Sequence, residues 1–443
     1  MMGNVPGNNC SLKWWGDFIK MLISIQKSKG QTFNQFKLAG VISVFSLMLI
    51  SFVTIDTVQA QGLDHDQRRA IIQSLSDEDR QKFFGMSREG KKKFFQERVE
   101  ESAGSGGQPA AQPGGVPGAE FIDVHVHLIG GRSNNEDYRG AAIEAIDHMD
   151  RLGIRKAIIL PPPQVINQDW YDYPAFVHAL HKYPDRFSFL GGGGELNSEL
   201  HKYSAPSSVT EDVKRAFADQ AEKTIRDGAI GFGEIASLHI SAVPGHPFEF
   251  VPADHPLLRV LADVAAKFDV PIDLHMDAAD NEMPVPPRFK DGDNPKLLPP
   301  TIEPLQRLLK YNPNAKIVWA HGGSDPLGSM SPALIGKLMD EHSNLYVSLR
   351  VVGGRAPMHN KLLSFGEIVP EWLNILNRHS DRFVIGSDSF FVSPNLRGSG
   401  PGTRFAQRNL PKLRATRHFL SLLPPSVARK ITRDNAIRIY GLK

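Results

Sequence analysis

The sequence predicts an α/β fold, namely a (β/α)8 barrel of the TIM type, preceded by an N-terminal signal peptide and a small helical extension. Three observations support this prediction. Eight strand-like apolar runs alternate with helix-like amphipathic stretches over about 325 residues, which is the number and size expected for such a barrel. Metal-compatible side chains recur at the ends of these runs. A long apolar segment precedes all of them.

Residues 1–60 have the pattern of a signal peptide. The run Leu38–Ile55 is apolar and almost uncharged, lysines precede it, and Val58-Gln59-Ala60 has the small-residue pattern of a cleavage site. The run of about 18 residues is also long enough to cross a bilayer, so an uncleaved membrane anchor is the alternative. We expect an exported protein, either periplasmic or secreted.

The chain that remains after cleavage would be almost neutral. The whole chain has a formal charge of +3, and residues 1–60 carry five lysines and two aspartates, which is also +3. A neutral protein has no electrostatic basis for binding nucleic acid. The only cysteine, Cys10, lies in the segment that cleavage would remove, so histidines and carboxylates must hold any metal.

Two short segments are predicted between the signal peptide and the barrel. Residues 61–102 are charged with helical spacing, and Ser76 before three acidic residues is typical of a helix N-terminus. This helical extension is either a docking arm or an appendage that packs on the domain or on itself. Residues 103–118 are rich in Gly, Pro, Ala and Gln, which predicts a flexible linker. The barrel then occupies residues 119–443.

Each strand of the barrel is predicted from an apolar run, and each helix from the amphipathic stretch that follows it. The strand candidates are Phe121–Leu128, Lys156–Leu160, Phe187–Leu190, Ala229–Ile235, Val270–Met276, Lys316–His321, Leu345–Val351 and Arg382–Asp388. The helix candidates are Ala141–Leu152, Tyr173–Lys182, Val209–Asp227, Pro256–Phe268, Glu303–Lys310, Pro332–Asp340, Ile368–Arg378 and Phe405–Leu422. A doubly wound sheet is the alternative, but it would not bring distant strand ends around one axis.

The first strand presents two histidines on one face. His125 and His127 are two residues apart, and residues i and i+2 of a strand point to the same side. Neutral imidazoles held at a fixed separation suit a metal such as zinc. Such a pair also arises by chance in a chain with 16 histidines, so the ends of the later strands decide the interpretation.

Four further metal-compatible residues end later strands. Glu234 ends the fourth strand, His275 the fifth, His321 the sixth and Asp388 the eighth. Catalytic groups of a (β/α)8 barrel come from the C-terminal ends of its strands. A buried structural histidine or a surface carboxylate would explain any one of them, but not all six at matching positions. We therefore expect one or two divalent ions, zinc in the first place, bound by His125, His127, Glu234, His275, His321 and Asp388.

This set of residues resembles the amidohydrolase superfamily. The closest resemblance is to the amidohydrolase-related branch, which includes aminocarboxymuconate-semialdehyde decarboxylase-like proteins, and it rests on Ile122-Asp123-x-His125-x-His127 and Gly386-Ser387-Asp388. It covers residues 119–443 and implies a divalent-metal hydrolase or a non-oxidative decarboxylase. Glu234 departs from the mononuclear decarboxylase-like pattern. It is similar to the bridging acidic ligand of the two-metal TatD-like deoxyribonucleases.

The same residues imply roles in catalysis. Asp388 is the expected general base, because it can contact both a metal and a water molecule, and the resemblance implies that it passes the proton to the leaving group. His321 is either a metal ligand or an acid/base that orients the substrate. Glu234 either bridges two ions or hydrogen-bonds a ligand histidine. Arg350, at the end of strand seven, and His239, in the loop after strand four, are expected to bind substrate; for Arg350 a structural role is the alternative.

Three functions fit the sequence. The first is a hydrolase that uses a metal-activated water to cleave an amide, lactone or related ester-like bond of a small molecule. The second is a metal-dependent decarboxylase of an aromatic or unsaturated carboxylic acid. The third is a non-catalytic binding barrel, which predicts a broken ligand set, whereas all six residues are present. The expected partner is a small-molecule substrate; a homo-oligomer is compatible with the sequence, and membrane contact is expected only with an uncleaved N-terminal segment.

Overall fold

The computed structural model describes residues 120–131, 136–163, 172–242, 246–352, 356–396, 406 and 409–442. The chain divides into two units, and all described residues belong to the second, Pro109–Lys443. The predicted signal peptide, helical extension and linker therefore lie outside the described residues. No helix in the described part is long and apolar enough to cross a membrane.

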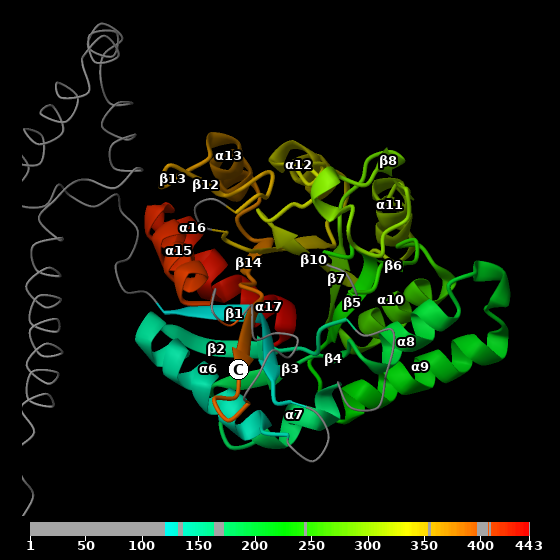
Figure 1. The fold of residues 1–443 in the computed structure, drawn as a ribbon, viewed down its shortest axis with the longest axis horizontal. Coiled ribbons are helices and arrows are strands. Elements are labelled where there is room, and N and C mark those ends of the chain that lie inside the picture. Colours follow the sequence, from blue (N-terminus) through cyan, green and yellow to red (C-terminus); the bar gives the residue numbers. More distant parts are fainter. Residues whose placement is uncertain are drawn as a thin grey trace, which may run out of the picture. The chain divides into compact units, whose positions relative to one another are not determined.

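The second unit is built on one mostly parallel sheet with helices around its outside (Figure 1). The segments of this sheet that correspond to the eight predicted strands are β1 (Phe121–Ile129), β2 (Ile154–Ile159), β3 (Phe187–Phe189) with β4 (Gly191–Gly192), β5 (Phe232–His239), β7 (Pro271–Met276), β10 (Lys316–Gly322), β11 (Leu345–Leu349), and β14 (Phe383–Ile385) with β15 (Ser389–Val392). Their parallel pairing brings the C-terminal ends of the strands to one side of the molecule.

The strand order is β3-β2-β1-β14-β11-β10-β7-β5-β4, with β15 paired to β1. The paired path does not close into a ring, because β3 and β4 form its two ends. These two segments are nevertheless consecutive in the chain and are separated only by Leu190. The Leu190 N–H donates to Ile159 O at 2.9 Å and the Gly191 N–H donates to Gly231 O at 3.2 Å. The segment 187–192 therefore pairs with β2 at one edge of the sheet and with β5 at the other. This arrangement is consistent with the predicted (β/α)8 barrel.

Helices follow the strands in order. They are α6 (Tyr138–Leu152), α7 (Tyr173–Leu180), α8 (Glu195–Lys202), α9 (Glu211–Arg226), α10 (Pro256–Phe268), α11 (Ile302–Tyr311), α12 (Pro332–Glu341), α13 (Pro370–Arg378), α15 (Asn409–Leu422), α16 (Pro425–Arg429) and α17 (Asn435–Tyr440). Side chains cap several of their first turns, as Ser, Thr and Asp commonly do. Asp137 accepts from Gly140 N, Thr210 from Val213 N and Ser331 from Leu334 N.

Three pairings of the sheet and its loops involve two-residue strands. β6 (Glu249–Phe250) pairs antiparallel with the end of β5, β8 (Met283–Pro284) pairs with β9 (Leu297–Leu298), and β12 (Leu363–Ser364) pairs with β13 (Glu367–Ile368).

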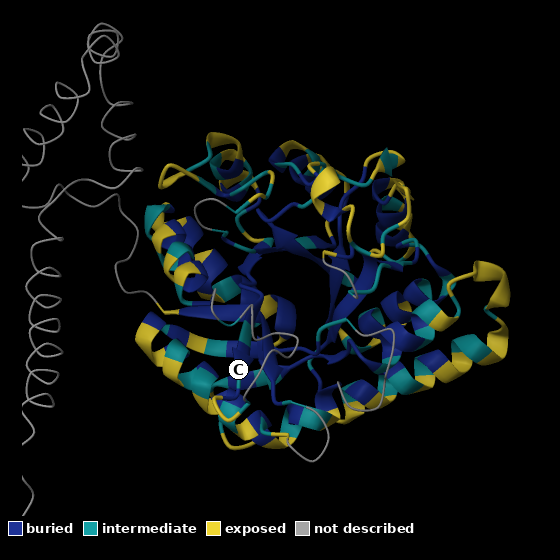
Figure 2. Ribbon diagram, in the orientation of Figure 1, coloured by how far each residue is buried: buried dark blue, intermediate teal, exposed yellow. Residues whose placement is uncertain are grey.

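The core has two layers, one between the sheet and its helices and one inside the sheet. Buried residues occupy the strands and the inward faces of the helices, whereas exposed residues lie on the outer helix faces (Figure 2). The inner layer is closed by the last helix described, since Ala436, Ile439 and Tyr440 of α17 pack against Ile122 and Val124 of β1. Lys316, the first residue of β10, donates to Ile439 O at 3.5 Å, so α17 covers the N-terminal ends of the strands.

The structure differs from the predicted elements at three places that concern the site. β5 continues to His239 instead of ending at Ile235, because residues 235–239 pair with β7 and with β6. Strand eight is split into β14 and β15, and Asp388 lies between them. The helix α8 was not predicted, because its only buried apolar side chains are Leu196 and Leu200.

Candidate metal centre

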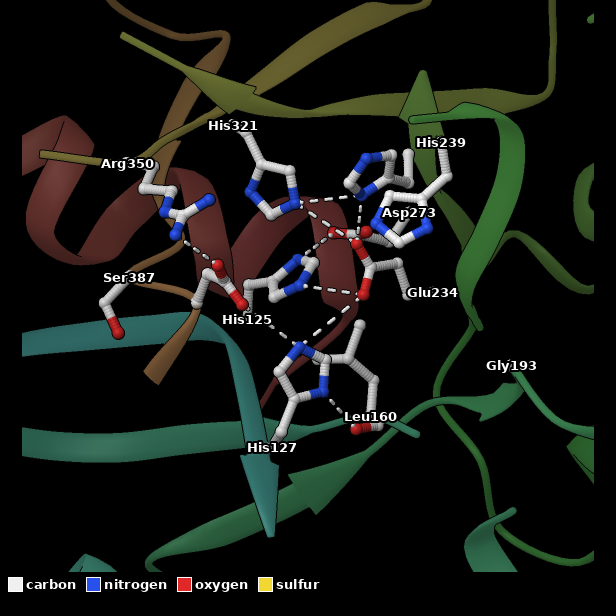
Figure 3. Close-up of polar contacts among 12 residues, drawn as sticks. His125, His127, Leu160, Gly193, Glu234, His239, Asp273, His321, Arg350 and Ser387 are labelled. Atoms are coloured by element: carbon white, nitrogen blue, oxygen red, sulfur yellow. Dashed lines mark hydrogen bonds and ion pairs between the residues drawn. The ribbon is translucent and has the colours of Figure 1, made fainter. Parts of the chain in front are cut away.

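The two histidines of β1 lie next to each other with their rings nearly perpendicular, at 83° (Figure 3). Their ring centroids are 5.0 Å apart, and neither side chain is exposed. The Nδ1 of His125 lies 3.2 Å from Asp273 Oδ2, and the Nδ1 of His127 lies 2.9 Å from Leu160 O. Both Nε2 atoms lack a hydrogen-bond partner among the described residues, and both face Glu234.

Glu234 lies between two pairs of histidines. Its Oε2 atom is 3.5 Å from the Nε2 of His125 and 3.5 Å from the Nε2 of His127. Its Oε1 atom is 2.5 Å from His275 Nδ1 and 3.1 Å from His321 Nε2, and those two nitrogens are 3.1 Å apart. Each oxygen of this buried carboxylate therefore faces its own pair of ring nitrogens.

Asp388 and Arg350 complete the other side of the cluster. Asp388 Oδ1 is 3.3 Å from His127 Nε2, and Asp388 Oδ2 is 2.8 Å from Arg350 Nη2. Arg350 lies one residue beyond β11, so its guanidinium reaches back over the strand ends. Arg350, which was predicted to bind substrate, thus forms an ion pair with Asp388, the predicted general base.

The backbone of Asp388 is held from several directions. Its N–H donates to His125 O at 2.9 Å, the buried Lys412 of α15 donates to its carbonyl oxygen, and the preceding Ser387 N–H donates to Asp123 Oδ1 at 2.9 Å. Asp388 has φ 53° and His321 has φ 72°. Left-handed conformations of residues other than glycine are uncommon and concentrate at functional sites. These contacts hold Asp388 in a conformation that is uncommon for a residue other than glycine.

Charges inside the cluster shift the pKa values of its members. Burial opposes ionisation of both carboxyls, yet the imidazoles of His125 and His275 hold the pKa of Glu234 well below its usual range. The Arg350 guanidinium does the same for the pKa of Asp388. Burial disfavours the imidazolium of His125, but Asp273 and Glu234 raise its pKa well above the usual range. Burial lowers the pKa of His321 to about 3.

These residues fit a divalent cation. The group His125, His127 and Asp388 and the group His125, Glu234 and His321 each offer ligand atoms within 4.8 Å of one another. Buried charges are normally paired or coordinate a metal, and the Nε2 atoms of both β1 histidines point into the cluster without a hydrogen-bond partner in the described part of the chain. Imidazole nitrogens and carboxylate oxygens are ligands that zinc accepts. A cation bound here would supply the positive charge that a proton on His125 otherwise provides.

His239 lies at the rim of the cluster. It is the last residue of β5, and its ring centroid is 4.4 Å from that of His275 and 4.8 Å from that of His246. Its Nδ1 lies 3.2 Å from Oε2 of the buried Glu249. Burial disfavours its charged form, but Glu249 raises the pKa of His239 to about 9. His246 has the opposite shift, since burial and the neighbouring His239 lower its pKa to about 4.

The structure brings together all eight residues that the sequence singled out for the site. It also adds three buried residues that sequence reasoning assigned no role, namely Asp123, Asp273 and Lys412. The period of two could have found the aspartates, because Asp123 precedes His125 by two residues and Asp273 precedes His275 by two. No local pattern marks Lys412, which reaches Asp388 from α15, 24 residues further along the chain.

The chain belongs to the amidohydrolase family. The model of this family matches residues 204–442, more than half of the chain. The matched segment includes Glu234, His275, His321 and Asp388 and begins after the two histidines of β1. No curated protein sequence matches the chain.

Solved structures with a similar fold include decarboxylases and hydrolases. A dihydroxybenzoic acid decarboxylase from Polaromonas sp. JS666, with bound manganese and the inhibitor 2-nitroresorcinol, is 15% identical, with 73% of this chain and 97% of that chain covered and a TM-score of 0.41. The L-hydantoinase (dihydropyrimidinase) from Arthrobacter aurescens is 15% identical, with coverages of 73% and 71% and a TM-score of 0.38. Amidohydrolase 2 from Bifidobacterium longum subsp. infantis is 12% identical, with coverages of 73% and 100% and a TM-score of 0.36.

Proposed function

We propose that this protein is a metal-dependent hydrolase that cleaves an amide, lactone or related ester-like bond of a small molecule. The observation that carries the proposal is the position of Glu234. Its two oxygens face two separate pairs of histidine nitrogens, at 3.5 Å on one side and at 2.5 and 3.1 Å on the other. A carboxylate between two ligand groups is the arrangement that a bridged pair of ions requires.

The proposed ligands divide into two groups that share Glu234. His125, His127 and Asp388 would hold one ion with Oε2, and His275 and His321 would hold the other with Oε1. Zinc is the proposed metal, because three or more imidazoles combined with carboxylates suit it better than magnesium or calcium. The chemistry that divalent ions would supply at this position is a water molecule of lowered pKa as nucleophile and polarisation of the bond to be broken.

Asp388 is the proposed general base. The adjacent Arg350 holds the pKa of Asp388 well below its usual range, so the carboxylate form that a base needs is present at neutral pH. Its Oδ1 faces the cluster at 3.3 Å from His127 Nε2. In the proposed reaction Asp388 takes a proton from the attacking water and transfers it to the leaving group.

Arg350 and His239 are the proposed substrate contacts. Arg350 keeps about a quarter of its side chain exposed, at 23%, and His239 keeps 21%, whereas the proposed ligands around them are buried. The Nη2 of Arg350 is engaged by Asp388 Oδ2 at 2.8 Å, and its Nε has no hydrogen-bond partner among the described residues. A guanidinium in this position can bind a substrate oxygen while it keeps Asp388 ionised.

The test is a panel of substrates given to zinc-loaded protein, with water addition and carbon dioxide release measured separately. We expect turnover of at least one amide, lactone or ester and no carbon dioxide from aromatic or unsaturated acids. Asp388→Asn is the companion variant. It should abolish this turnover while the protein remains folded by circular dichroism. Carbon dioxide release without water addition would replace the proposal with a decarboxylase, and wild-type turnover by Asp388→Asn would remove Asp388 as the base.

A further inference from the structure

Asp273 is a buried carboxylate that the proposed reaction does not use. It lies on β7, two residues before His275, and none of its surface is exposed. Its Oδ2 atom is 3.2 Å from the Nδ1 of His125 (Figure 3). Within the described residues this is the only hydrogen bond of the side chain, because Oδ1 has no partner there.

This hydrogen bond decides which nitrogen of His125 is available to a metal. An ionised carboxylate can only accept, so Nδ1 of His125 carries a proton. In the neutral ring, which is the form that binds a cation, the lone pair is then on Nε2, and this atom faces Glu234 Oε2 at 3.5 Å. A ligand histidine typically donates its other ring N–H to a carboxylate or a carbonyl group, which fixes the tautomer and the orientation of the ring.

The Nδ1 atoms of the two β1 histidines face acceptors of different charge. His127 Nδ1 lies 2.9 Å from the neutral carbonyl oxygen of Leu160, whereas His125 Nδ1 faces the carboxylate of Asp273. An anionic acceptor makes the imidazole the stronger electron donor. The acceptor of His125 is a side chain, which mutation can remove, whereas the acceptor of His127 is a backbone carbonyl. The effect of the acceptor on metal binding can therefore be tested at His125.

The backbone of β5 packs closely against Asp273, but this residue contributes little to the stability of the fold. A Cβ atom on Gly233 would lie 2.8 Å from the Cβ of Asp273, so the glycine allows β5 to pack closely against this residue. Tyr440 of α17 has a buried hydroxyl group, and burial together with the charge of Asp273 raises the pKa of this phenol. A carboxylate with a single hydrogen bond opposes folding at such a position, where an apolar side chain would cost less.

We propose that Asp273 is a positioning residue, which holds the imidazole of His125 with Nε2 directed at the candidate metal centre and so raises the affinity of this centre for its cation. The inference rests on the proposed function, because it assumes that His125 is a ligand. It assigns a role to a residue that lies outside the proposed ligand set.

The test measures metal binding without substrate. Metal-free wild type, Asp273→Ala and Asp273→Asn are titrated with Zn²⁺ against a chromophoric chelator, and Co²⁺ absorption spectra are recorded for each. We expect about 10–100-fold weaker Zn²⁺ binding for Asp273→Ala, which is the usual size of this effect, together with a changed Co²⁺ spectrum. Asp273→Asn should lose less, because its amide oxygen can still accept from Nδ1.

Two further variants separate positioning from folding. Asp172→Ala removes another buried carboxylate that contacts no proposed ligand, and it should lower stability but leave Zn²⁺ affinity unchanged. If Asp273→Ala does not fold, Asp273→Leu fills the space without an acceptor and carries the same expectation. Folded Asp273→Ala or Asp273→Leu protein with wild-type Zn²⁺ affinity and Co²⁺ spectrum would overturn this inference alone. Wild-type protein that binds no Zn²⁺ would overturn the proposed function as well.

Discussion

Single residues decide how many ions the centre can hold, and Glu234 is the most informative of them. Its oxygens face the ring nitrogens of four histidines on three strands. If the carboxylate only oriented one ligand histidine, a single contact of this kind would be enough. The double set of contacts therefore favours a bridge, and the distinction can be measured.

The prediction for Glu234→Gln follows from ligand chemistry. An amide is a poor bridge between cations, so we expect the variant to lose about one equivalent of metal and nearly all activity. Metal content per folded protein, measured by plasma emission spectroscopy, gives the answer. A variant that keeps its full metal content and binds about 10–100-fold more weakly would show instead that Glu234 supports one ligand.

Contacts between elements fix the loops around the site, and the Asp172 carboxylate shows how. Asp172 precedes α7 and accepts from the N–H groups of Tyr173 at 2.6 Å, Gly194 at 2.9 Å and Glu195 at 2.9 Å. It also accepts from Gly192 N at 3.1 Å. One side chain thus connects the first turns of α7 and α8 to the short segment β4, which is one end of the paired sheet.

Loss of this carboxylate should destabilise the fold. Asp172→Ala leaves several buried N–H groups without acceptors, and hydrogen bonds to charged groups contribute more than neutral ones, so we expect a loss of about 2–4 kcal/mol in the free energy of unfolding. Urea denaturation followed by circular dichroism measures it. Asp185→Ala, at an exposed aspartate, is the control and should change this free energy by less than about 0.5 kcal/mol. Equal stabilities of the two variants would contradict the prediction.

At the scale of elements, the sequence predicts strands better than it predicts where they end. Apolar runs such as Val270–Met276 and Lys316–His321 coincide closely with β7 and β10, because strands buried on both faces contain few polar residues. The prediction ended strand four near Glu234, yet β5 continues beyond it, since a charge that is paired by histidines does not interrupt a strand.

The site was predictable to the extent that its residues follow the periodicity of the strands. His125 and His127 on β1 and His275 on β7 could be found from their positions in the runs. The Arg350–Asp388 contact and the Asp273–His125 contact could not, because each joins residues on different strands and depends on register. Sequence spacing alone does not give the distance between two strands that are far apart in the chain.

At the scale of the whole molecule, the predicted linker should separate two parts that behave independently. Residues 103–118 contain too few apolar side chains to form a core, so limited proteolysis should cut there and leave a folded, active fragment close to residues 119–443. Mass spectrometry of the fragment and an activity assay check this. Loss of folding after deletion of residues 61–118 would show that the helical extension is part of the core.

Export gives the second prediction at this scale. If Leu38–Ile55 is the apolar part of a cleaved signal, the mature protein should begin near Gln61 and be recovered from the soluble fraction of the cell envelope or the medium. Mass spectrometry of the N-terminus distinguishes the outcomes. An intact N-terminus in the membrane fraction would favour the anchor.

The packing of α17 against β1 has a consequence for the order in which the chain can fold. The inner core joins Ile122 and Val124, near the beginning of the barrel, to Ile439 and Tyr440, more than 300 residues later. Contacts of such separation form late, because the loop between them must be closed first. During synthesis β1 can therefore complete its inner core only after the more than 300 residues that precede α17 have been made.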